Sequence, residues 1–387
     1  MLSQNVQIVC GAGIVSGKEI ISLLLARGLR DAGWNPEFVT SCWSDGTFVH
    51  RLEQGGFNYQ RLRLGFISAS LRMRPLMMTL DQLRFWPALA YRYSRHIAAT
   101  APQAVIHTNW HHALLLLPLL RQHRDIFWVH ELFPNVPHYA QVLRAIAKRV
   151  GRVVCISHAV AGSVLALGVP ESHVTVIYNG LPAVELMPTS TDPATLRLGI
   201  VGQIGAWKGH EDLLDALALL ARDGISVKLR IFGAGDRGYI EALKARIVEL
   251  NLDDQVQWRG VVNKQPDIYR EIDVCVQPSR FDEPFGMSAL EASAFGRPVI
   301  GSSRGGLPEI IEHGVTGLIV EAQRPDQLAQ AIKSFARQPD LLRTMGESAR
   351  KRARAEFSFD SFVSRYITVI EEITGEGTNM GMTSLAP

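Results

Sequence analysis

The chain has 387 residues, of which 47% are apolar, 20% charged and 8% aromatic. This composition excludes a collagen, a coiled coil and a largely disordered chain, and the length predicts about two packed domains. The longest apolar run, residues 113–120, has eight residues and contains Pro118, whereas a membrane-spanning helix needs about 20. The sequence does not open with a basic segment and an apolar core, so a cytoplasmic protein is expected rather than an exported one.

Charge is distributed unevenly along the chain. Residues 1–180 carry 17 Lys and Arg against 9 Asp and Glu, together with ten of the 12 His, whereas the remainder carries 23 basic and 28 acidic residues. Two parts with opposite net charge indicate two domains that bind different ligands.

Short apolar runs alternate with helical periodicity in the first part of the chain. Residues 6–10 predict a strand, which a Gly-rich turn connects to a helix over residues 19–30. Further strands are predicted over residues 37–40, 104–107, 126–130 and 152–156. Strands separated by helices are typical of a parallel sheet covered on both faces.

The pattern breaks at residues 181–195, which are rich in Pro, Ser and Thr and are predicted to link domain 1–180 to domain 196–357. In the second domain, strands are predicted over residues 196–201, 226–232, 256–258, 274–277 and 298–301, and helices over 210–222, 239–251 and 287–295. A helix over 358–374 is expected to pack back on the first domain, and 375–387 to form a frayed tail. The expected fold class is α/β, with two Rossmann-like, doubly wound parallel-sheet domains that face a central cleft and bind ligands at the carboxyl ends of their strands.

Two glycine-rich loops match nucleotide-binding motifs incompletely. In residues 11–19, Ala12 and Glu19 replace the Gly and the hydroxyl residue of a Walker A motif, and Ser16 replaces a Gly of the dinucleotide fingerprint. Residues 233–238 do match G-x-G-x-x-G, but they follow the second strand of their domain rather than the first. Plain turn chemistry is therefore favoured over a kinase or a nicotinamide-dependent enzyme.

The segment 278–317 carries the strongest functional signal. Glu283 and Glu291 flank a Pro-Phe-Gly turn and a helix that begins near Met287. The free N–H groups at that helix start favour a diphosphate, and carboxylates beside a phosphate are suited to accept hydrogen bonds from sugar hydroxyls. The pattern indicates a nucleotide-sugar pocket, although a capped surface helix with two solvated acids explains the spacing equally well.

Several motifs together resemble those of the retaining GT-B glycosyltransferases of family 4. They are the Glu-x7-Glu pair at 283–291 with GRPVIGSSRGGLPEII and HGVTGLIV after it, the loop IVGQIGAWKG at 200–209, and CISHAV and VTVIYNGLP at the domain junction. The similarity extends from about residue 6 to about residue 370. The combination is specific, whereas any single motif is not.

The resemblance implies roles for individual residues in donor binding. Lys208 is expected to contact the donor diphosphate, Glu283 the hydroxyls of the transferred sugar, and Glu291 the ribose hydroxyls. Gln203 replaces the family's usual Arg, which lowers the expected diphosphate affinity unless another Arg compensates. Gly17 matches one glycine of the family's first loop and is expected to let a backbone N–H approach the phosphate. The backbone expected to cradle phosphate and sugar is that of Phe285, Gly286, Met287 and Ser288.

The same resemblance places histidines in the basic half. His130 matches the family histidine near the reactive end of the sugar, and a core histidine satisfied by backbone is the alternative. Trp110 and His111, with His107 and His112, are expected to line the acceptor side. A zinc site is disfavoured because no Cys or carboxylate lies at ligand spacing, and neither a metal nor another cofactor is expected.

The four cysteines, Cys10, Cys42, Cys155 and Cys275, are far apart in the sequence. None forms a Cys-x-x-Cys pair, and three lie in apolar runs. Buried structural thiols are therefore predicted rather than disulfides, zinc ligands or a nucleophile.

Residues 61–95 contain seven Arg and one acidic residue, interleaved with Met, Phe, Trp and Tyr. Such a strip suits an anionic membrane surface, so peripheral contact with the inner face of the cytoplasmic membrane is expected. An ordinary helix with one solvated and one buried face is the alternative. Nucleic acid is not an expected partner, since no base-reading motif accompanies the strip.

The resemblance implies a retaining transferase that moves a hexose-type sugar from GDP-mannose or a UDP-sugar to a lipid-linked or polysaccharide acceptor, such as lipopolysaccharide, in cell-surface glycan synthesis. A sugar-nucleotide epimerase or hydrolase of the same fold is one alternative. An inactive nucleotide-sugar-binding scaffold is the other, and Gln203 is its best argument.

Overall fold

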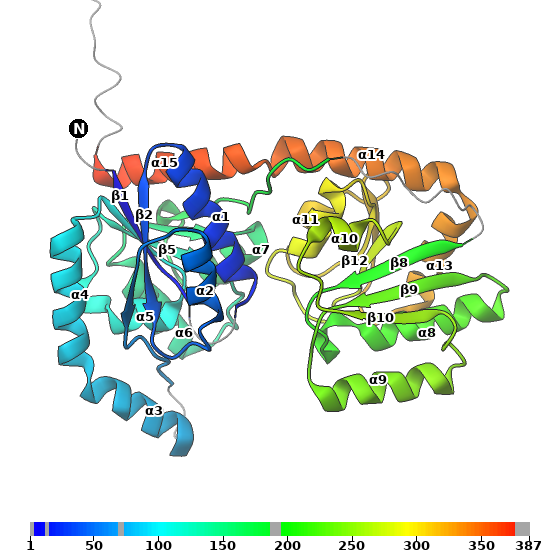
Figure 1. Ribbon diagram of the computed structural model, residues 1–387, viewed down its shortest axis with the longest axis horizontal. Helices are drawn as coiled ribbons and strands as arrows, with labels where there is room; N and C mark the ends of the chain where they lie inside the picture. Colours follow the sequence, from blue (N-terminus) through cyan, green and yellow to red (C-terminus); the bar gives the residue numbers. More distant parts are fainter. Residues whose placement is uncertain (1–3, 12–14, 69–72, 186–194, 376–387) are drawn as a thin grey trace, which may run out of the picture. The chain divides into compact units, whose positions relative to one another are not determined.

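The computed structural model describes residues 4–11, 15–68, 73–185 and 195–375, without the side chains of residues 74 and 75. The chain divides into two compact units, residues 1–180 with 359–387 (unit 1) and residues 181–358 (unit 2). Most of the predicted linker, residues 186–194, and nearly all of the predicted tail, residues 376–387, lie outside the described residues. Each unit is a parallel sheet with helices on both faces (Figure 1).

Unit 1 contains a seven-stranded sheet in the order β3-β2-β1-β4-β5-β6-β7. The strands are β1 (Asn5–Val9), β2 (Asn35–Ser41), β3 (Tyr59–Leu62), β4 (Ala104–His107), β5 (Asp125–Val129), β6 (Arg152–Cys155) and β7 (Val174–Val176). All neighbouring strands pair in parallel. The strand order reverses between β1 and β4, which is where doubly wound sheets bind ligands.

The helices of unit 1 come from both ends of the chain. They are α1 (Gly17–Asp31), α2 (Thr47–Gln54), α3 (Met73–Arg84), α4 (Trp86–Thr100), α5 (Trp110–Leu115), α6 (Pro137–Ala147), α7 (His158–Ala166) and α15 (Phe359–Thr374), with 3-10 turns η1 (Leu117–Leu119) and η2 (Glu171–His173). None of the helices in the described part of the chain is long and apolar enough to cross a membrane.

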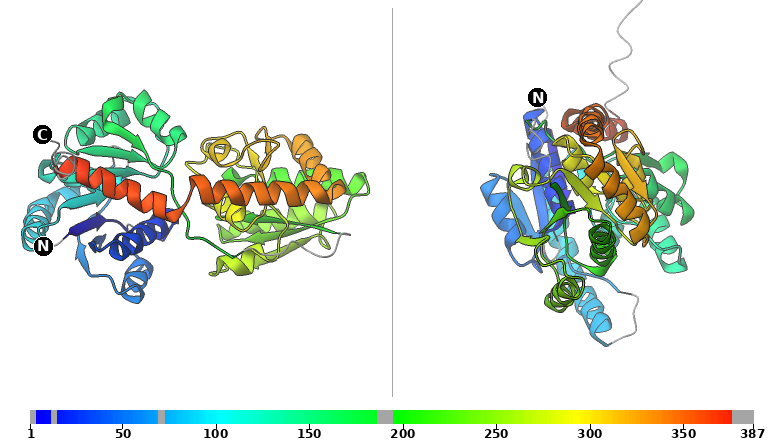
Figure 2. Two further views of the ribbon diagram at one scale, coloured as in Figure 1. Left: turned by 90° about the horizontal axis from the view of Figure 1, so that it is seen from above. Right: turned by 90° about the vertical axis from the view of Figure 1, so that its right-hand side faces the viewer.

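Helix α15 is an integral part of unit 1, although it lies at the far end of the sequence. It runs beside α1 (Figure 2). The ring of Tyr366 lies 5.0 Å from that of Trp128 on β5, and Phe362 lies 6.0 Å from the same ring. At the crossing with α1, Gly28 leaves room for Val363 and Phe359. The last helix therefore closes the core of the first unit.

Unit 2 contains a six-stranded parallel sheet in the order β10-β9-β8-β11-β12-β13. The strands are β8 (Leu196–Val201), β9 (Val227–Phe232), β10 (Val256–Gly260), β11 (Val274–Gln277), β12 (Val299–Ser302) and β13 (Gly317–Val320). The helices are α8 (His210–Arg222), α9 (Arg237–Glu249), α10 (Gln265–Tyr269), α11 (Met287–Ala294), α12 (Leu307–Ile310), α13 (Pro325–Arg337) and α14 (Pro339–Glu356), with the 3-10 turn η3 (Ala206–Lys208). The order reverses between β8 and β11. The two sheets confirm the predicted Rossmann-like α/β class.

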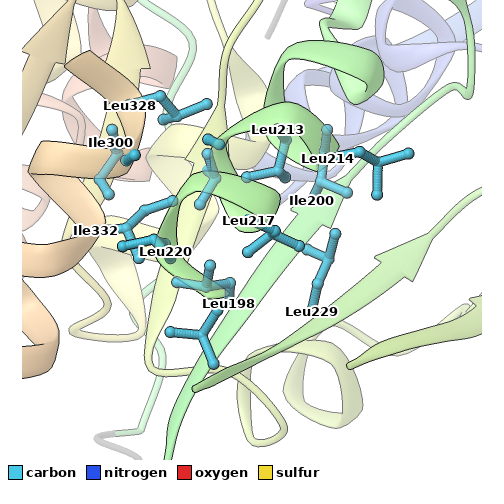
Figure 3. Packing of buried hydrophobic residues seen from close by; sticks show 14 of the residues in the cluster. Leu198, Ile200, Leu213, Leu214, Leu217, Leu220, Leu229, Ile300, Leu328 and Ile332 are labelled. Carbon is cyan, nitrogen blue, oxygen red and sulfur yellow. The ribbon is translucent and has the colours of Figure 1, made fainter. Parts of the chain in front are cut away.

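The core of unit 2 forms around α8, whose apolar residues recur at helical spacing. Leu213, Leu217 and Leu220 are each at most 1% exposed. They pack with Leu198 of β8 and Ile332 of α13 (Figure 3). Burial of each such side chain contributes about 1.5 to 3 kcal/mol. This packing fixes α8, and with it the loop that leads from β8 into the helix.

The cysteines divide into two groups. Cys10, Cys155 and Cys275 are buried, but Cys42 is exposed, and all four are free thiols. The prediction of a buried thiol is wrong for Cys42 because the residue follows the end of β2, where the chain leaves the sheet. Burial raises the pKa of Cys10 to about 11 and that of Cys275 to about 12, so both remain protonated at neutral pH.

Gly28→Ala is expected to lower the free energy of unfolding by about 1 to 3 kcal/mol, the usual effect of overpacking. A Cβ atom there would lie 2.2 Å from Val363 Cγ2 and 2.9 Å from Phe359 Cζ, which forces α1 and α15 apart. Thermal or urea unfolding measures the change. Gly162→Ala in α7 is the matched control, since its Cβ would meet no atom within 4 Å and Ala is favoured over Gly in a helix by about 1 kcal/mol. Equal effects of the two variants would contradict the described packing.

Candidate functional site

Three loops meet at the carboxyl edge of the unit 2 sheet, beside the point where the strand order reverses. They follow β8, β11 and β12. The N–H of Arg280, after β11, donates to the carbonyl oxygen of Trp207, after β8, at 2.8 Å. The N–H of Gly306, after β12, donates to the carbonyl oxygen of Glu283 at 2.7 Å. Backbone hydrogen bonds therefore hold the three loops as one surface.

An ion pair lies in this surface. Lys208 Nζ is 2.6 Å from Glu283 Oε2, and the two side chains are 18% and 17% exposed. Ser279 Oγ donates to the same carboxylate oxygen at 3.2 Å. Lys208 and Glu283 are both predicted from the sequence as donor-binding residues, but their contact with each other is not. Because both side chains remain partly open to solvent, a ligand can reach the pair.

Helix α11 begins beside this ion pair. Its N-cap residue, Gly286, has a φ of 110°, and a Cβ there would lie 2.7 Å from Leu307 Cδ2, so only glycine fits. Phe285 is 2% exposed, and Ser288 Oγ donates to the Val201 carbonyl at 3.0 Å. The side chains of Phe285 and Ser288 therefore serve packing. The first turn of α11, which starts at Met287, presents the positive end of the helix to a ligand.

Glu291 lies in the second turn of α11, and a buried tyrosine holds it. Tyr269 Oη donates to Glu291 Oε2 at 2.9 Å, and the Tyr269 ring stacks on Phe295 with 5.0 Å between centroids. Burial raises the pKa of Glu291, and hydrogen bonds from Tyr269 and Gln265 partly oppose that shift. The sequence gives no local signal for this role of Tyr269, because Tyr269 precedes Glu291 by 22 residues and reaches it only through the fold.

Arg280, in the loop after β11, is engaged elsewhere and does not replace the charge lost at Gln203. Gln203 is exposed in the loop after β8. Arg280 Nε lies 2.7 Å from Asp212 Oδ2, and a second guanidinium nitrogen lies 2.7 Å from Glu211. The hydrogen bonds that Arg280 donates to Asp212, together with the negative charges of Asp212 and Glu211, raise the pKa of Arg280. Arg280 therefore fastens its loop to α8. Arg304, exposed in the loop after β12, is a candidate for the missing charge.

The glycines of the G-x-G-x-x-G match serve backbone packing. A Cβ at Gly233 would lie 1.8 Å from the carbonyl oxygen of Gly202, and one at Gly235 would lie 2.0 Å from that of Ile204. Both glycines let the loop after β9 press against the loop after β8. This contact agrees with the preferred interpretation of plain turn chemistry and helps to position Lys208.

In unit 1, α1 begins beside the β1–β4 switch point. A Cβ at Gly17, the first helical residue, would meet no atom of the described residues within 4 Å. Glu19 accepts a hydrogen bond from the Ser16 N–H at 2.9 Å and so caps the helix start. The open space at Gly17 is compatible with close approach of a ligand to the backbone.

His130 follows β5 and has a neutral ring. Its Nε2 atom is buried and has no hydrogen-bond partner within the described part of the chain. Burial, and to a lesser degree the charge of Lys18, lowers its pKa well below the usual value. Lys18 lies in the first turn of α1 and affects His111 and His112 in the same direction. Sequence analysis did not assign Lys18 a role.

Trp110 and His111 form an aromatic stack at the start of α5, with 3.6 Å between ring centroids. Tyr139 meets Trp110 edge-on at 5.7 Å. His111 Nδ1 accepts a hydrogen bond from the Ile67 N–H at 3.2 Å, and burial lowers the pKa of His111 to about 4. The stack is partly exposed, so it can present an aromatic face to a ligand.

His107 and His112 do not line an accessible surface, so the prediction for these two residues is wrong. Both are fully buried. His107 Nε2 lies 2.7 Å from Asp125 Oδ1 inside the sheet, and His112 lies on the inner side of α5. Among the residues that the structure describes, no group of three His, Cys, Asp or Glu side chains could hold a metal ion.

Comparison with known proteins identifies the family. The profile for Glycosyltransferase Family 4 matches residues 15–183, and that for Glycosyl transferases group 1 matches residues 192–352. The chain is 34% identical over 217 residues to an uncharacterized glycosyltransferase of Methanocaldococcus jannaschii, covering 52% of this chain and 54% of that protein. It is 32% identical over 191 residues to the D-inositol 3-phosphate glycosyltransferase of Streptomyces coelicolor, covering 47% and 39%. The alignments thus span about half or less of these curated relatives.

Among solved structures, the fold is similar to that of Anabaena HepE in complex with UDP and glucose. The TM-score is 0.75 at 19% identity, and the match covers 95% of this chain and 99% of that chain. Two parallel Rossmann-like sheets of this kind define a GT-B fold. The chain belongs to the group 1, family 4 glycosyltransferases, a retaining family, which confirms the predicted family.

His107→Ala is expected to lower the free energy of unfolding by about 2 to 3 kcal/mol, because Asp125 loses a buried partner. The control is His138→Ala, which removes an exposed imidazole from the same unit. Thermal unfolding of both variants measures the difference. A His107→Ala variant that keeps its stability but loses acceptor affinity would contradict this structural role and indicate that His107 contacts the acceptor.

Proposed function

We propose that the protein transfers a hexose, with retention, from a nucleotide-sugar donor to a lipid-linked or polysaccharide acceptor of cell-surface glycan synthesis. The observation that carries the proposal is the cluster of Lys208, Glu283 and the amino end of α11 at the reversal of strand order in unit 2. A diphosphate, a hexose and a ribose each have a group of matching chemistry there. The complex of HepE with UDP and glucose supports a UDP-hexose as the first donor to test, with GDP-mannose second.

The Lys208–Glu283 pair suggests how the donor would engage. A diphosphate oxygen is a strong partner for the Lys208 ammonium, so its arrival would release the Glu283 carboxylate to accept a hydrogen bond from a hydroxyl of the transferred sugar. The Lys208 charge and the amino end of α11 would then stabilise the negative charge that grows on the leaving diphosphate. Gln203 and the backbone from Phe285 to Ser288 would complete this donor pocket.

Glu291 would bind the ribose. A carboxylate accepts hydrogen bonds from two neighbouring hydroxyls, and Tyr269 fixes the orientation of this carboxylate. Burial raises the pKa of Glu291, and its hydrogen bonds with Tyr269 and Gln265 favour the ionised form that the hydroxyls would need.

The acceptor would bind to unit 1. The stack of Trp110 and His111, with Tyr139 beside it, offers aromatic faces against which a sugar ring can pack. Gly17 would let a phosphate approach the start of α1, and the neutral ring of His130 would exchange hydrogen bonds with the sugar near its reactive carbon. The enzyme would work in the cytoplasm, at the inner face of the membrane, where lipid-linked intermediates are exposed to it. We assign no role to nucleic acid or to a resident cofactor.

The Lys208→Ala variant is expected to lower turnover by roughly 10²-fold, the scale for losing one preorganised charge donor. Calorimetric titration of the wild type with UDP-, GDP- and ADP-sugars first identifies the donor, and product analysis with and without acceptor then measures turnover. Lys244→Ala is the matched control because Lys244 is exposed and pairs only at the surface of α9 with Glu241. Sugar release or epimerisation without acceptor would support the epimerase or hydrolase instead, and donor binding without any product would support an inactive scaffold.

Donor affinity is expected to fall as pH drops through the raised pKa of Glu291, since the protonated acid accepts fewer hydrogen bonds. Tyr269→Phe removes a hydrogen bond that holds this pKa down, so the fall should begin at higher pH. At neutral pH the affinity should weaken by about fivefold to tenfold, the effect of about 1 to 1.5 kcal/mol. Calorimetry between about pH 5 and pH 8, where proteins are usually most stable, measures both the pH dependence and the affinity change.

The control for this experiment is Tyr366→Phe in unit 1. Tyr366 is as buried as Tyr269, but its Oη has no hydrogen-bond partner within the described residues. If Tyr269→Phe and Tyr366→Phe show the same pH profile, Tyr269 does not act through Glu291.

A further inference from the structure

Helix α3 exposes its apolar side to solvent. Met73, Met77, Leu80 and Leu83 are 73%, 60%, 53% and 50% exposed. Met73, Met77 and Leu80 follow the spacing i, i+4, i+7 and so form a stripe along one face, with Leu83 at its edge. Figure 1 shows α3 leading away from the sheet of unit 1.

Polar side chains of α3 hold the helix to the protein, although Met78, which lies between Asp81 and Gln82 around the helix, is also 50% exposed. Gln82 is 2% exposed, and its Nε2 donates to the carbonyl oxygen of Arg63 at 2.7 Å. Thr79 Oγ1 accepts a hydrogen bond from the Ser68 N–H at 3.0 Å. The carboxylate of Asp81 pairs with the Arg63 guanidinium at 2.6 Å.

This arrangement is the reverse of a normal surface helix, which buries its apolar face and exposes its polar one. The tethers to the segment 63–68 keep α3 in this orientation, because turning the helix over would break all three of them. A contiguous apolar face that is held toward solvent in this way indicates a surface that contacts a membrane or another protein.

The surroundings of the apolar stripe are basic. Arg84 is exposed within the stripe, at i+4 from Leu80. The next helix, α4, exposes Tyr91, Arg92 and Arg95. Asp81 is the single acidic residue between positions 61 and 95, and Arg63 already neutralises it. The surface therefore combines apolar side chains with uncompensated positive charge.

We infer that α3 lies in the interface of an anionic membrane, with Met73, Met77 and Leu80 among the acyl chains and with Arg84, Arg92 and Arg95 at the headgroups. Methionine adapts its shape to a fluid environment, and apolar residues flanked by basic ones are the signature of interfacial helices. A second copy of the chain is a poorer occupant, because a symmetric contact through α3 would bring like charges together.

This inference deepens the proposed function. It rests on that function for the purpose of the membrane contact, which is access to a lipid-linked acceptor. The contact itself needs no donor. Vesicle binding measured without a nucleotide sugar therefore tests the membrane surface alone, while transfer to a soluble acceptor tests the enzyme alone.

The experiment is co-sedimentation of the full chain with phosphatidylcholine vesicles that contain about 30% phosphatidylglycerol, an anionic fraction chosen so that each Arg near the surface adds measurably to binding. The double variant Met77→Asp with Leu80→Asp is expected to bind at least tenfold more weakly than wild type. Val248→Asp is the control for adding an acid to an exposed apolar position, since Val248 is 61% exposed on α9 of unit 2; it gains one negative charge, against two in the double variant. All three proteins should unfold at similar temperatures, because the substituted side chains are exposed.

A second variant tests the charge. Arg92→Gln with Arg95→Gln is expected to weaken binding at low salt and to reduce its salt dependence. The inference is overturned if wild type ignores anionic vesicles, or if the Met77 and Leu80 variant binds as well as Val248→Asp. It is also overturned if light scattering shows a wild-type dimer that this variant converts to a monomer, since α3 would then cover a second copy.

Discussion

The contact between the Lys208 ammonium and the Glu283 carboxylate is the interaction around which the candidate site of unit 2 is organised. The two residues come from loops after different strands, and each loop is fixed by its own scaffold. The tight glycine contacts between the loops after β8 and β9 position Lys208, while Arg280 fastens the loop of Glu283 to the start of α8. Neither charge is buried deeply enough to be locked, so an anion can separate them.

The two glutamates of the Glu-x7-Glu pair, Glu283 and Glu291, lie in different environments although they are close in the sequence. Glu283 meets a cation and solvent, whereas Glu291 meets the hydroxyl of Tyr269 in a buried setting that raises its pKa. Separating the acids in this way avoids two like charges in one cavity. It also gives each acid a distinct partner chemistry, which is the requirement for binding a ligand that contains both a diphosphate and two sugars.

Unit 1 uses its histidines for several purposes. His107 supports the sheet through Asp125, His111 stacks with Trp110, and His130 remains neutral beside the charge of Lys18. On another side of the unit, α3 and α4 share a basic segment but bury opposite kinds of residues: α4 buries Leu89 and Tyr93, whereas α3 buries Gln82. Two helices from one continuous stretch of sequence therefore differ in what they expose.

The sequence determined the α/β class and most strands, because periodicity is local. It also predicted a donor-binding role for Lys208, Glu283 and Glu291, because these residues lie in loops and helix starts whose motif spacing and chemistry can be recognised in isolation. The strands that were not predicted, β3, β7 and β13, are short, lie at sheet edges and contain partly exposed residues, so their apolar signal is weak. Helices α13 and α14 were also not predicted, although their sequences carry a detectable helical periodicity. Only the tertiary structure decided that His107 and His112 are buried, that Tyr269 supports Glu291, and that the apolar side of α3 faces outward. Each of these depends on contacts between residues distant in the chain, and burial is a property of the packed neighbours rather than of the residue itself.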